Sequence, residues 1–168
     1  MYEIGDSGQR LNFSDLVLAQ FKRHQQRRLS DDEAGGQLFA RVSEKEIAVV
    51  DVTGPRPTDR RSRYAYVPDR SAERREISER HLAGLQFVGD WHTHPARYGH
   101  PSPQDLASMA EMVRKSKHSL NGFVLVIVGQ ARLPSGLYVC VHDGVRAYEL
   151  LAGRKRRGIL TLIARNLG

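Results

Sequence analysis

One segment of the chain joins an apolar strand to a helix through a loop rich in histidine and proline. Leu85–Trp91 has the character of a buried strand and leads directly into His92 and His94. Because alternate residues of an extended chain point the same way, both imidazoles can face one point at the strand end. Ser102 is a capping residue followed by proline, and Asp105 brings a carboxylate into the first turn. The fold must therefore hold the end of this strand, the loop and the start of the helix close together.

Two imidazoles and one carboxylate, from His92, His94 and Asp105, make a set of three metal ligands. A zinc ion held by three such ligands keeps its fourth tetrahedral position for water, which is the pattern of a catalytic site. Zinc lowers the pKa of bound water from 15.7 to about 7 and polarises carbonyl groups. The spacing therefore predicts one Zn²⁺ ion with a bound water, and it leaves the general base unassigned.

The same residues resemble the motif of the JAMM (JAB/MPN) metalloproteases. In that family His-Ser/Thr-His-Pro is followed by Ser-x-x-Asp, and a glutamate lies well upstream, commonly in Glu-x-x-Gly-x-Leu. This chain contains His92–Pro95, then Ser102 and Asp105 at eight and eleven residues after the second histidine, and the matching Glu33–Leu38 upstream. The resemblance covers about residues 14–150.

The resemblance implies a role for each matched residue. His92, His94 and Asp105 would be the zinc ligands, Glu33 would be the general acid/base, and Ser102 would donate a hydrogen bond to the developing oxyanion. As a helix N-cap, Ser102 also has a purely structural role, and the two roles can coexist. The implied activity is a zinc metallopeptidase of isopeptidase type, which cleaves amide or isopeptide bonds with water as nucleophile.

The only cysteine, Cys140, lies in an apolar stretch with no evident activating base, so we expect no covalent acyl-enzyme. Trp91 is expected to pack at the strand end. Asp90 has two interpretations: it orients a ligand imidazole, or it is a surface charge.

The 168 residues suit one domain. The resemblance implies an α/β (α+β) fold with a curved mixed, largely antiparallel sheet, flanked by helices and with the zinc at one end. A basic segment, 151–168, would follow the core. Local patterns predict helices and strands along the chain. The predicted helices are 14–27, 68–83 and 102–114; the predicted strands are 34–42 and 46–52 as a hairpin, then 64–67, 85–91, 122–129, 137–142 and 145–151.

The net charge is +7 with a pI near 9.9, which suits an acidic protein, a nucleic acid or an anionic surface. Loop 54–63 holds prolines and arginines and is expected to be exposed, either as an ion-paired face or as a contact to substrate. The run 154–157 lacks the interleaved aromatic residues that stack on bases, so nucleic-acid binding is not expected. The apolar segment 159–163 could be a helix or a strand.

The longest apolar run is too short to cross a bilayer and the start of the chain lacks a signal-peptide pattern, so we expect a cytoplasmic protein without membrane contact. The size resembles that of small bacterial JAB proteins of CBASS anti-phage operons. That likeness implies cleavage after the C-terminus of a ubiquitin-like or CD-NTase-type protein, alongside E1- and E2-like enzymes. Two alternatives stay open: trimming of sulfur-carrier precursors, and a noncatalytic metal-binding adaptor.

Overall fold

A computed structural model describes residues 1–153 of the chain; the basic run 154–157 and the segment 159–163 lie outside the described residues. Its helices and strands largely follow the predicted pattern. The helices are α1 (Asp15–His24), α2 (Arg70–Leu82) and α3 (Pro103–Lys115); the strands are β1 (Tyr2–Ile4), β2 (Gln9–Phe13), β3 (Gly35–Val42), β4 (Glu46–Val52), β5 (Arg60–Ser62), β6 (Ala65–Val67), β7 (Gln86–Thr93), β8 (Phe123–Val128), β9 (Leu137–His142) and β10 (Ala147–Glu149).

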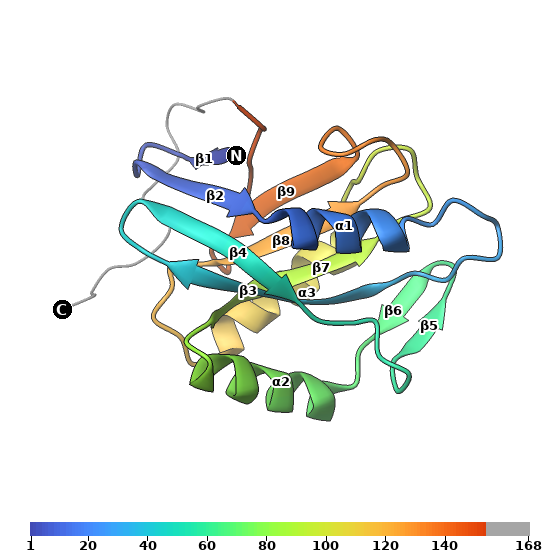
Figure 1. Cartoon of the computed structure of the whole chain (residues 1–168), viewed down its shortest axis with the longest axis horizontal. Coiled ribbons are helices and arrows are strands. Elements are labelled where there is room, and N and C mark those ends of the chain that lie inside the picture. Colours follow the sequence, from blue (N-terminus) through green and yellow to red (C-terminus); the bar gives the residue numbers. More distant parts are fainter. Residues whose placement is uncertain (154–168) are drawn as a thin grey trace.

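Eight strands form one sheet in the order β1-β2-β4-β3-β7-β8-β9-β10, and β5 and β6 form a separate hairpin. The neighbours β2/β4 and β7/β8 are parallel, and the other pairs are antiparallel. Figure 1 shows α1 on one face of the sheet and α2 and α3 on the other. These features confirm the predicted mixed, largely antiparallel sheet with helices on both sides.

The centre of the sheet is buried on both faces because helices cover it from both sides. All six residues of β8 are buried. On β7, Trp91 is fully buried; its ring packs against Phe21 of α1, and its indole N–H donates to the carbonyl of Thr53 at 3.1 Å. The expectation that Trp91 packs at the strand end is confirmed.

Three expectations differ from the structure. Strands β1, β2 and β5 were not predicted: β1 and β2 are short and carry few apolar residues, and β5 consists of three exposed polar residues within the expected loop 54–63. The first helix ends at His24 rather than near 27, since the buried side chains of Gln25 and Gln26 turn to bond backbone carbonyls of later segments. Loop 54–63 is not wholly exposed: Arg56 is buried and ion-paired with Asp59 and Glu76.

In the described part of the chain, none of the helices combines the length and the apolar character needed to span a bilayer.

The first residues of β3 run very close to the backbone that follows β4. A Cβ atom on Gly36 would overlap the carbonyl oxygen of Thr53, the same oxygen that accepts the Trp91 hydrogen bond. The glycine of the Glu-x-x-Gly-x-Leu pattern is therefore required by backbone packing.

We predict that Gly36→Ala lowers the free energy of unfolding by about 2 to 3 kcal/mol, because the two backbone segments must separate. Gly84→Ala is the matched control, since Gly84 has φ of 77° but open space around it and should cost about 1 kcal/mol. Urea unfolding of both variants measures the difference. An equal or larger loss for Gly84→Ala would contradict the packing argument.

Candidate metal centre

Pairing between β3 and β7 places Glu33 beside the two histidines. Gly35 is the register partner of His92, so the chain just before β3 passes the end of β7. Beyond the last pair, the N–H of Thr93 donates to the carbonyl of Ala34 at 2.8 Å, and the N–H of Ala34 donates to the Thr93 hydroxyl at 2.9 Å. The residue between the histidines thus fixes the residue next to Glu33.

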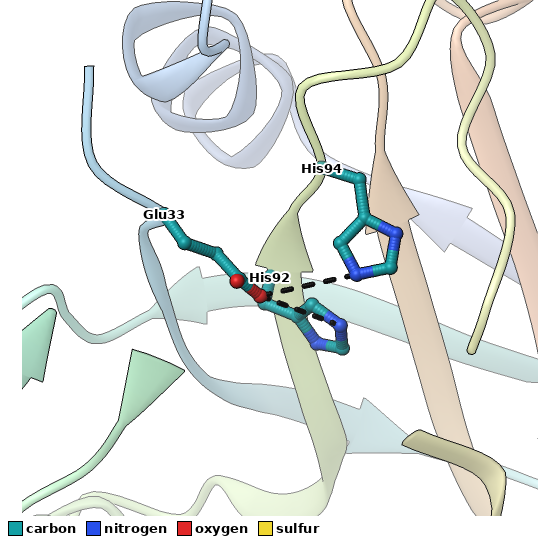
Figure 2. Close-up of side chains that lie close together, drawn as sticks. All are labelled: Glu33, His92 and His94. Atoms are coloured by element: carbon teal, nitrogen blue, oxygen red, sulfur yellow. Dashed lines mark ion pairs between the residues drawn. The ribbon is translucent and has the colours of Figure 1, made fainter. Parts of the chain in front are cut away.

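Four side chains converge at this end of the sheet. Figure 2 shows the Glu33 carboxylate facing both imidazoles, with Oε1 at 3.8 Å from Nε2 of His92 and 3.9 Å from Nε2 of His94. These three residues form a group whose ligand atoms all lie within 4.8 Å of one another. Asp105 is closer to both rings: Oδ1 is 3.2 Å from Nε2 of His92, and Oδ2 is 3.4 Å from Nε2 of His94.

Backbone groups hold two of these side chains in place. Nδ1 of His94 lies 2.8 Å from the carbonyl oxygen of His100, so that nitrogen carries the proton and leaves the Nε2 lone pair facing the other groups. At the start of α3, the N–H of Ser102 donates to Oδ2 of Asp105 at 2.6 Å, and the N–H of Asp105 donates to the Ser102 hydroxyl at 3.2 Å. This capping box leaves the Ser102 hydroxyl proton available as a donor.

The donor set fits a divalent metal ion. Nε2 of His92 is buried and, although Oδ1 of Asp105 lies 3.2 Å away, it makes no hydrogen bond of acceptable geometry among the described residues. A buried nitrogen without a partner is costly unless something else occupies its lone pair, and zinc binds neutral imidazole and carboxylate groups. Metal binding would satisfy this atom.

The pKa values of the two carboxyl groups are shifted in opposite directions because their surroundings differ. Burial raises the pKa of Glu33 to about 7, with a smaller opposing effect of His92 and a smaller reinforcing effect of Asp105. Burial also acts to raise the pKa of Asp105, but His92 and the N–H of Ser102 outweigh it and hold that pKa well below its usual range. Burial lowers the pKa of His94, which favours the neutral ring that a metal requires.

A pocket of about 480 Å³ opens around these groups. Its wall includes Glu33, both histidines, Ser102 and Asp105, so all five residues that the sequence singled out line one cavity. Other parts of the wall come from β6, α3 and the residues between β6 and α2.

Two further expectations concern residues outside this group. Asp90 is not a surface charge: its Oδ1 is buried, and burial raises its pKa to about 7. Cys140 is buried in β9, and burial raises the pKa of its thiol to about 12, so it is no nucleophile at neutral pH.

Sequence reasoning missed Gln26, which is fully buried behind the site. Its side-chain oxygen accepts from the Thr93 hydroxyl at 2.9 Å, and its nitrogen donates to the carbonyls of Asp31 and Arg63. An isolated glutamine at a helix end carries no spacing signal that could have identified it.

Comparison with known families settles the relationship of the chain. The model of the prokaryotic homologues of the JAB domain matches residues 16–142. The chain belongs to this family.

Individual JAB relatives agree with that assignment. A Pseudomonas aeruginosa protein named CD-NTase/cGAS isopeptidase is 30% identical over 132 residues, which cover 73% of this chain and 79% of the relative. A protein of Sinorhizobium fredii, named probable metalloprotease y4qB, is 32% identical over 92 residues, or 52% of this chain and 56% of the relative. Among solved structures, a Desulfitobacterium hafniense protein superposes with a TM-score of 0.60 at 17% identity, covering 90% of this chain and 94% of its own.

The raised pKa of Glu33 predicts a pH-dependent stability of the metal-free JAB domain. Between pH 4.5 and 7 the unfolded chain ionises this carboxyl while the folded chain keeps it protonated, so the free energy of unfolding falls as pH rises. We predict that Glu33→Gln removes this part of the fall. The difference in free energy of unfolding between the variant and the parent should therefore shift in favour of the variant by on the order of 2 kcal/mol from pH 4.5 to pH 8.

Urea unfolding of chelator-treated protein at the two pH values measures this gain. Glu111→Gln is the control, because Glu111 is exposed on α3 and its ion pair with Lys115 lowers its pKa. The same gain in both variants would show that Glu33 is not the buried acid.

Proposed function

We propose that this JAB domain is a zinc metallopeptidase that hydrolyses an amide or isopeptide bond. The main support is that two imidazoles and two carboxylates converge in one pocket, and that the pKa values of the two carboxyl groups are shifted in opposite directions. Zinc, when bound, would polarise the scissile carbonyl and make water more acidic.

The distances support His92, His94 and Asp105 as the residues that would hold the metal. Bond lengths of 2.0 to 2.2 Å in a tetrahedral zinc site separate neighbouring ligand atoms by roughly 3.3 to 3.5 Å. The Asp105 oxygens lie 3.2 and 3.4 Å from the two Nε2 atoms, whereas Glu33 Oε1 lies 3.8 and 3.9 Å from them. Asp105 therefore fits a ligand position, and Glu33 fits a position just outside it.

Glu33 would act as general base and then as general acid. The Glu33 carboxylate lies just outside the metal position, from which it can accept a proton from the attacking water and return it to the more basic leaving amine. The Ser102 hydroxyl lines the same pocket and would donate to the oxygen that gains negative charge. The buried Cys140 leaves water as the nucleophile.

Two relatives named CD-NTase/cGAS isopeptidase, from Pseudomonas aeruginosa and Enterobacter hormaechei, favour a substrate of the same class. We propose that the protein cuts after the C-terminus of a CD-NTase or ubiquitin-like protein, and so releases it from conjugates in anti-phage defence. E1- and E2-like enzymes would form those conjugates.

Purified parent and variants, incubated with CD-NTase and ubiquitin-like fusions from the same genome, test the proposal. We predict that Glu33→Gln keeps zinc and loses cleavage by at least about 100-fold, since general acid–base catalysis supplies about that much. Asp105→Asn should lose both zinc and cleavage, because an amide replaces the charged ligand while its oxygen can still cap α3. Glu111→Gln should behave as the parent.

Metal analysis and the rate of product formation are the two measurements. Cleavage by Glu33→Gln at the parental rate would refute the assigned base. Cleavage that survives complete removal of zinc by a chelator would refute the metallopeptidase proposal. A fusion with a sulfur-carrier protein, cleaved faster than every CD-NTase fusion, would change the proposed substrate but not the chemistry.

A further inference from the structure

The pocket continues past the metal-binding residues, along β7 and α3. Asp90 precedes His92 by two residues and so lies on the same face of β7, one step farther from the strand end. On α3, Met109 and Met112 follow Asp105 by four and seven residues, on the same side of the helix. Leu125 of β8 is the register partner of Asp90. Asp90, Met109, Met112 and Leu125 all line the pocket.

In this part of the pocket, Asp90 has a hydrogen-bond acceptor without a donor. Oδ1 of Asp90 is buried and has no hydrogen-bond partner among the described residues. Gln37 lies directly opposite Asp90 across β3 and β7, on the same face of the sheet, and it is only 2% exposed. Its Oε1 is also buried without a partner in the described chain. Gln37 lies behind the pocket wall, whereas the unpaired Asp90 oxygen belongs to a residue of the wall and indicates a place for a group that brings a donor.

The nearby cations are already paired with other carboxylates, which leaves the Asp90 carboxylate for a cationic donor from outside. Arg70, on the pocket wall, is ion-paired at 2.8 Å with Glu73, which is buried. The neighbouring Arg56 is ion-paired with two further carboxylates. Both guanidinium groups that act on Asp90 are thus paired with other carboxylates, and Asp90 itself forms no ion pair within the part of the chain that the structure describes.

We propose that Asp90 ends a subsite for a lysine or arginine side chain that flanks the scissile bond of the substrate. Met109, Met112 and Leu125 would pack against its apolar stem, and Asp90 would accept hydrogen bonds from its charged end. Two residues along a strand span about 6.6 Å, which matches the reach of roughly 6 Å of such a side chain from the reacting centre. The subsite rests on the proposed peptidase function for its substrate, but its binding chemistry can be tested separately.

The first experiment measures binding without catalysis. n-Propylguanidinium and its neutral isostere N-propylurea are titrated into the zinc-loaded protein while the amide NMR signals of Asp90, Met109 and Leu125 are followed. The guanidinium stays protonated, so it is no zinc ligand. We expect it to bind at least about tenfold more tightly than the urea, with shifts at these three residues. Equal binding of the two compounds would overturn the proposal and indicate a pocket that water satisfies.

The second experiment uses variants and the substrate. Asp90→Asn keeps the size of the side chain and should abolish the tenfold preference, whereas Glu111→Gln, which removes an equal charge from the exposed face of α3, should keep it. Metal analysis checks that Asp90→Asn retains zinc. If this variant lost zinc, the comparison of the two compounds in the parent would still stand. A preference that persists in zinc-loaded Asp90→Asn would overturn the assignment of Asp90.

In a cleavable fusion, the residues flanking the cut are changed in turn to lysine and glutamine. The parent should cleave the best lysine variant about tenfold faster in kcat/KM than its glutamine counterpart, and Asp90→Asn should cleave both alike. Cleavage with no such preference would overturn the subsite and leave the proposed function standing. If no fusion is cleaved, the proposed function fails, and the two probe compounds still decide the subsite.

Discussion

The pairing of β3 with β7 is the constraint on which the site depends. It places Gly35 opposite His92, and the hydrogen bonds between Ala34 and Thr93 carry the pairing one step further, so Glu33 faces both imidazoles. From behind the site, the Gln26 side chain hydrogen-bonds both to the Thr93 hydroxyl and to the segment before Glu33. An acid just before one strand and two histidines at the end of another can keep a separation of under 4 Å only because this backbone network leaves them little freedom.

Burial then divides the two carboxylates. Glu33 is surrounded by protein and receives little compensation, whereas Asp105 receives the Ser102 N–H at the start of α3 and lies against His92. Glu33 is thereby suited to carry a proton and Asp105 to remain charged. Hydrolysis at a metal needs both kinds of carboxylate. Farther along the sheet, Oδ1 of Asp90 on the pocket wall also lacks a donor among the described residues, so the polar requirements of the pocket continue beyond the metal ligands.

The motif residues were predictable because their spacing reflects secondary structure directly: His92 and His94 alternate along a strand end, and Ser102 and Asp105 share a helix start. The burial of Asp90 was not predictable, since alternation with Trp91 suggests an exposed face, whereas helices cover both faces of this sheet. Arg56 was placed in an exposed loop for a similar reason; only the fold brings Glu76 of α2 to its guanidinium. Local patterns specify the elements and the motif, and long-range packing specifies which charges are enclosed.

We propose that one zinc ion is held by His92, His94 and Asp105, with Glu33 beside it as a base. A crystal structure of the zinc-loaded protein, with the ion located by anomalous scattering at the zinc edge, tests this claim directly. We expect zinc at about 2.0 to 2.2 Å from both Nε2 atoms and from one Asp105 oxygen, with the Glu33 carboxylate outside bonding distance. Zinc bonded to Glu33 in place of Asp105, or located away from the two imidazoles, would contradict it.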